Sequence, residues 1–198
     1  HQMNVFQSVF QDSQWSKTLP ITSKHQWVLG FGNKDTLLDQ ALWDQVTSAF
    51  PNAQFIGCTT SGEIHGTRML DNTLVITSVE FEKTSIQATS KSINNFESTT
   101  DMCAALMSEL PSEGLRHIFV LSDGQLVNGS KLVDGLQALL PTGVQITGGL
   151  AGDDDRFEET FVRHNDNVDN GLVVAVGFYG DNINFGYGNY GGWKPFGP

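Results

Sequence analysis

Apolar and polar positions follow the same order twice along the chain, since residues 28–63 align with residues 118–153 without a gap. Each copy opens with an apolar run that is typical of a strand and ends at a polar residue, Asn33 or Asp123. Apolar residues spaced three and four positions apart then predict a helix. Both helices should end just before a proline, because proline cannot continue a helix. The pattern therefore indicates an internal duplication.

Three strands are predicted after the helix of each copy. They cover residues 54–63, 72–76 and 85–93 in the first copy and residues 144–153, 170–174 and 183–190 in the second. A run of strands after a helix favours antiparallel pairing, so we predict an α+β fold of duplicated β-α-β-β-β units with central sheets and outer helices. Two such units can stack as α-β-β-α layers, and one mixed sheet fits the same pattern.

Domain boundaries follow from the repeat. We expect residues 1–24 to be an N-terminal segment, in part left over from expression, and residues 25–198 to be one domain. Its two repeats should cover about residues 27–93 and 117–190. A further helix is predicted between them, where Met102, Leu106 and Leu110 share one face.

Composition excludes several classes of protein. The formal net charge of -11 would repel nucleic acid, and no apolar stretch approaches the roughly 18 residues of a membrane helix. The two cysteines, Cys58 and Cys103, give no particular support to a disulfide. We therefore expect a cytoplasmic protein that contacts neither nucleic acid nor membrane.

Glycine and hydroxyl residues gather at the end of the second strand in each copy. Small side chains there would let a ligand approach the backbone closely, or would let strands pack tightly on helices. Because duplicated strand ends should converge, we favour a shared ligand site. The predicted site residues are Cys58, Thr59, Thr60, Gly62 and Glu63 in the first copy and Gly148, Gly149 and Asp153 in the second.

Two of these residues allow a more specific prediction. Glu63 and Asp153 match in the alignment, so their carboxylates could face each other and bind an ammonium group or a cation, or could simply be solvated. Cys58 with His65 as base would suit a nucleophile, but the acidic residues nearby favour the thiol. We expect binding and no catalysis.

Three segments resemble the FIST family of sensory domains: residues 55–64, residues 148–154 and residues 191–197. The resemblance covers about residues 25–198 and matches the amino-terminal half of that family, so we expect the carboxy-terminal FIST half to be absent from this chain. It implies a sensor in bacterial signal transduction that binds an amino acid or related metabolite. Trp193 and Pro195 of the last segment should contact the ligand or a partner.

One branch of the family implies an alternative function. It resembles haem-binding nitric oxide sensors that regulate a histidine kinase or a cyclic-di-GMP enzyme. Haem needs an axial ligand such as histidine in an apolar pocket, and His65 and His164 follow the glycine-rich strands. The sequence identifies no cofactor beyond this candidate. A protein-interaction scaffold without a ligand remains a third hypothesis.

Overall fold

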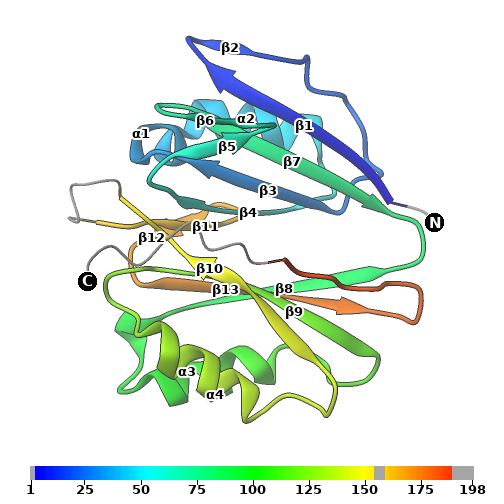
Figure 1. The fold of residues 1–198 in the computed structure, drawn as a ribbon, viewed down its shortest axis with the longest axis vertical. Helices are drawn as coiled ribbons and strands as arrows, with labels where there is room; N and C mark the ends of the chain where they lie inside the picture. The colour runs from blue at the N-terminus through cyan, green and yellow to red at the C-terminus, as the bar shows by residue number, and fades with distance from the viewer. Residues whose placement is uncertain (1–2, 154–158, 189–198) are drawn as a thin grey trace, which may run out of the picture.

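The computed structural model describes residues 3–153 and 159–188. Two large sheets stack face to face, and helices cover the outer face of each (Figure 1). The predicted α+β class, with largely antiparallel sheets and outer helices, is confirmed. Of the two arrangements that the pattern allowed, the chain adopts the α-β-β-α layers.

The first sheet has seven strands. Their spatial order is β12 (Asn167–Asp169), β11 (Val162–His164), β4 (Gln54–Thr59), β3 (Trp27–Gly32), β7 (Leu74–Phe81), β1 (Met3–Gln11) and β2 (Gln14–Trp15). Only β3 and β4 run parallel in this sheet, because the helices of the first copy connect them.

The second sheet has four strands, and a separate hairpin forms the third sheet. The order in the second sheet is β10 (Gln145–Leu150), β9 (Leu115–Ser122), β13 (Leu172–Tyr179) and β8 (Ser85–Ser92), and the hairpin consists of β5 (Glu63–His65) and β6 (Arg68–Leu70). Here too one pair is parallel, β9 with β10, and a helix connects it.

Capping side chains fix where the helices begin. The described helices are α1 (Lys34–Leu38), α2 (Gln40–Ala49), α3 (Thr99–Ser108) and α4 (Gly129–Gln137), with a 3-10 turn at Ile93–Asn95. Asn33, Asp39, Ser98 and Asn128 each accept a hydrogen bond from the first turn of the helix that follows. None of these helices has both the length and the apolar character needed to cross a membrane.

Three apolar cores hold the four layers together. One lies between α1, α2 and the seven-stranded sheet, with Trp43 and Phe50 at its centre. Another lies between α3, α4 and the four-stranded sheet. The third fills the space between the sheets, where Ile56 and Cys58 of β4 meet Val174 and Val176 of β13.

The duplication is visible in the strand order. In the first unit β3 lies between β4 (parallel) and β7 (antiparallel), and in the second unit β9 lies in the same way between β10 and β13. A further antiparallel strand completes each set, β1 beside β7 and β8 beside β13. The two units therefore begin at β1 and at β8.

These unit boundaries differ from the predicted repeats. Residues 3–15, assigned to a segment before the domain, form β1 and β2 of the larger sheet. The strand at residues 85–93, assigned to the first repeat, pairs as β8 with the second. Residues 183–188 form no strand, and residues 189–190 lie outside the described part. Apolar patterning identifies strands but not their neighbours.

The register corrects the alignment of the two copies. Gly30 pairs with Gly57, and Val120 of β9, at the position of Gly30, pairs with Gly148. Gly57 and Gly148 are therefore equivalent, one position away from the gap-free alignment. The connection from helix to strand in the second copy holds one extra residue, and the predicted match of Glu63 with Asp153 is wrong.

The hairpin of the second unit crosses to the sheet of the first. Strand β11 pairs antiparallel with β4, which places Arg163 opposite Gly57. Residues 151–161 connect β10 to β11 and are long enough for this crossing, whereas only residues 60–62 connect β4 to β5. The β5–β6 hairpin consequently stays outside both large sheets.

Candidate functional site

The ends of β4 and β10, which carry the predicted ligand site, lie side by side. The backbone N–H of Gly152 donates to the Thr59 carbonyl at 2.9 Å. The N–H of Thr59 donates to the Phe161 carbonyl at 2.9 Å, and the N–H of Phe161 donates to the Thr59 hydroxyl at 3.0 Å. Residues from both units thus form one hydrogen-bonded junction.

The two neighbouring glycines of β10 have different environments. A Cβ on Gly148 would overlap the carbonyl of Val120, so this glycine permits close strand packing, as Gly57 does beside Gly30. A Cβ on Gly149 would meet no atom within 4 Å. Gly149 pairs with Leu121, whose side chain packs between the sheets, so it faces the inter-sheet side and leaves open space there.

Cys58 and Thr59 are buried. Cys58 is 2 % exposed in the core between the sheets, and burial raises the pKa of its thiol to about 12. The thiol is therefore protonated at neutral pH and is a weak nucleophile. Thr59 is held by Phe161, so the first part of the predicted site is mainly packed structure.

The two predicted carboxylates are each bound within their own unit. Glu63 is 1 % exposed, and its Oε1 accepts from the hydroxyl of Thr60 at 2.8 Å. Its Oε2 accepts from the hydroxyl of Thr73 at 2.8 Å. Asp153 is buried and accepts from the backbone N–H of Glu159 at 3.1 Å. Glu63 therefore ties β5 to β7, and Asp153 organises the crossing from β10 to β11.

Gly62 allows the turn into β5. Its φ of +142° is rarely adopted by residues with a side chain, and a Cβ there would lie 3.1 Å from the Met69 side chain. Trp193 and Pro195 lie outside the described residues.

The predicted haem ligands are placed unfavourably. Nε2 of His164 faces Gln54 Oε1 at 3.0 Å, and Nδ1 faces the hydroxyl of Ser90 at 2.8 Å. Both ring nitrogens are therefore engaged, and coordination would break one hydrogen bond. His65 is half-buried in the β5–β6 hairpin. Neither lines an apolar pocket found among the described residues, so these positions do not fit a haem.

Two buried histidines and one half-buried histidine should make the fold sensitive to mild acid. Burial lowers the pKa of His25, His117 and His164 below the usual 6.5. As pH falls, the unfolded chain therefore binds protons at a higher pH than the folded chain does. The folded state loses stability relative to the unfolded state as pH falls below about 6.5. Each proton contributes at most about 1.4 kcal/mol per pH unit.

Urea unfolding at pH 7.5 and pH 5.5 measures this effect. We expect the free energy of unfolding of His164→Gln to fall less over this interval than that of the unmodified protein, because glutamine carries no titrating proton. Equal pH dependence of the two proteins would contradict the assignment to His164.

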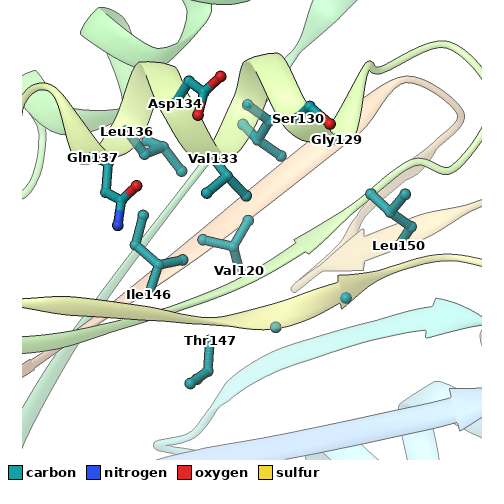
Figure 2. A pocket seen from close by; sticks show the side chains of 13 residues that line it. Val120, Gly129, Ser130, Val133, Asp134, Leu136, Gln137, Ile146, Thr147 and Leu150 are labelled. Atoms are coloured by element: carbon teal, nitrogen blue, oxygen red, sulfur yellow. The ribbon is translucent and has the colours of Figure 1, made fainter. Parts of the chain in front are cut away.

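The sequence did not predict a groove between α4 and β10. It has a volume of about 650 Å³, and its lining is mostly apolar. Val133 of α4 and Ile146 of β10 point into it from opposite sides, while Thr147 points away from α4 (Figure 2). Gly148 and Gly149 of the predicted site lie on its β10 border. The signal that could have revealed it is Val133, an apolar residue that the helix leaves exposed.

Two further buried polar residues support this region. Arg163 is 1 % exposed, although arginine is mostly a surface residue. Asp123 accepts from the backbone N–H of Gln125 and from the hydroxyl of Thr160, which fixes the junction from the side of the second unit.

Comparison with known families agrees with the resemblance in the motifs. The model of the FIST N domain matches residues 26–198. No curated protein matches the sequence.

Proposed function

The chain belongs to the FIST family of sensory domains, which bind small ligands in signal transduction, and on this premise we propose that it binds an amino acid or a related metabolite. The binding site would lie where β4 and β10 end, on the inter-sheet side of Gly149. The observation that carries the proposal is the open space above Gly149 next to the Thr59–Gly152 junction. A ligand there would contact backbone of both units at once.

The chemistry of the site suits a small zwitterion. Thr60 and Ser61 bring hydroxyls to the junction, and Ser61 lies against Gly152. Asp153 follows directly, and its carboxylate would take the ammonium group. We propose that occupancy alters contact with a cytoplasmic signalling partner such as a histidine kinase or a cyclic-di-GMP enzyme.

Thermal unfolding in the presence of amino acids, related metabolites and haem tests the proposal. A ligand that binds only the folded chain stabilises it by about 2.7 kcal/mol at a concentration of 100 Kd, which should raise Tm by several degrees. We expect a concentration-dependent rise for one class of amino acid or metabolite.

The variant Gly149→Val places a side chain in the open space, where an added Cβ meets no atom within 4 Å. It should unfold at nearly the unmodified temperature and lose the ligand-induced rise. If the rise persists in a folded Gly149→Val protein, the ligand binds elsewhere. If no compound raises Tm, the scaffold hypothesis gains support.

A further inference from the structure

Equivalent edges of the two units differ in one respect. Strand β4 has β11 on its outer edge, whereas no strand pairs with the outer edge of β10 among residues 3–153 and 159–188. The two edges are equivalent because Gly57 and Gly148 occupy the same register position. In the described part of the chain, the position beside β10 is therefore open, whereas the equivalent position beside β4 is occupied by β11.

Strand β11 fills its position with backbone and with one long side chain. Arg163 lies opposite Gly57 on the helix side of the sheet, and its guanidinium carbon is 4.8 Å from the centre of the Trp43 ring. Its Nη2 donates to the Leu37 carbonyl at 3.2 Å. A cationic side chain thus occupies the space between α2 and β4.

The groove under α4 is the corresponding space of the second unit. It lies between α4 and β10 (Figure 2). Arg163 lies in the same way between α2 and β4. Val133 is at the repeat position of Trp43 and is 44 % exposed, and Leu150 at the other end is 53 % exposed. The smaller side chain on α4 leaves room for an incoming one.

The groove under α4 has a carboxylate at the same repeat position as the space that Arg163 occupies in the first unit. Asp44 of α2 is one of the carboxylates whose charge acts on Arg163, and the repeat places Asp134 at the same position of α4. Asp134 lines the groove. An apolar slot with a carboxylate at its border is suited to the long stem and charged end of arginine or lysine.

Neither of the nearest candidates fills this position. The β5–β6 hairpin, the counterpart of β11–β12, is restrained by its short connection and by the hydrogen bonds from Thr60 and Thr73 to Glu63. A second copy of the chain is disfavoured, because each copy carries a formal net charge of -11.

We propose that the outer edge of β10 docks an extended strand of a partner protein, antiparallel to β10, with an arginine or lysine opposite Gly148 that enters the groove under α4. Such strand addition combines backbone hydrogen bonds, which give affinity, with a side-chain pocket, which gives specificity. The proposal goes beyond the proposed function, since it requires no small ligand.

A peptide of residues 159–170 is a suitable probe, because it contains the strand that fits the equivalent edge. Amide hydrogen exchange of the intact chain should slow at residues 145–150 as the peptide is added. A peptide with Met in place of Arg163 should bind roughly fivefold more weakly. The protein variant Asp134→Asn should bind the Arg163 peptide more weakly and discriminate less between the two peptides, as a double-mutant cycle requires.

Substitution at the groove provides the matched control. Val133→Lys should place a like charge in the groove and prevent protection of β10 by the peptide, while Leu139→Lys, on an exposed residue just after α4 and outside the groove, should have no effect. Unslowed exchange at residues 145–150 of the unmodified chain, or equal binding by Val133→Lys, would overturn the proposal.

Protection of β10 without peptide would overturn it as well. Protection that disappears on dilution would assign the edge to a second copy, and protection at every concentration would assign it to the chain itself. The peptide experiments do not depend on the outcome of the ligand screen, and the ligand screen does not depend on peptide binding.

Discussion

The substitution Gly148→Ala should lower the free energy of unfolding by roughly 3 kcal/mol, whereas Gly149→Ala, one residue further on, should change it by less than about 0.5 kcal/mol. A Cβ at Gly148 would lie far inside the 3.0 Å that Cβ atoms keep from other heavy atoms, and the atom in its way is a backbone carbonyl of β9. The φ of Gly148, +147°, adds strain for any residue with a side chain. Neither cost applies at Gly149.

Urea unfolding of the two variants measures the difference. Gly149 faces open space and its φ lies outside the left-handed region, so an added methyl meets no obstacle. A stability loss of similar size in both variants would mean that β10 tolerates no side chain for a reason other than contact with Val120.

Replacement of Arg163 by methionine should lower the free energy of unfolding by about 3 kcal/mol. Nε and Nη2 of Arg163 donate to the Leu37 carbonyl, at the end of the short helix α1, and Nη1 donates to the Asn165 carbonyl at 3.0 Å. Methionine keeps the apolar volume but leaves these carbonyls without their donor. A buried acceptor that loses its partner costs about 1–3 kcal/mol.

The matched control is Arg68→Met on the exposed strand β6, which should change stability by less than about 0.5 kcal/mol. Arg163→Met with unchanged stability would show that apolar packing on Trp43 compensates for the lost hydrogen bonds. That result is known for some buried charges, whose removal from water costs as much as their contacts return.

The parts of the fold that depend on local pattern could be predicted. The apolar runs at β3 and β9 and the helical spacing after them predict the β-α-β order twice. Helix α2 ends close to Pro51 as predicted, whereas α4 ends at Gln137, four residues before Pro141. Sheet membership could not be predicted in the same way. Strand β8 follows the first unit in sequence but pairs with β13 of the second.

The candidate site was predicted as a region but not in its detail. The junction of Thr59 with Gly152 lies within the segments that the glycine pattern indicated. The sequence could not separate Gly148 from Gly149, because their difference arises from the register of β10 on β9. Arg163 could not be identified as a buried residue, since its burial depends on a hairpin that leaves its own unit.

That crossing hairpin has a consequence for synthesis on the ribosome. Strand β4 is complete once residue 59 has been made, but its edge partner β11 begins at residue 162. At about 5–20 residues per second, the first sheet waits roughly 5–20 s with an apolar strand edge unpaired. During this interval the unpaired edge of β4 can form hydrogen bonds with an extended segment of another chain. We therefore expect the nascent chain to be most prone to aggregation before its second half has emerged.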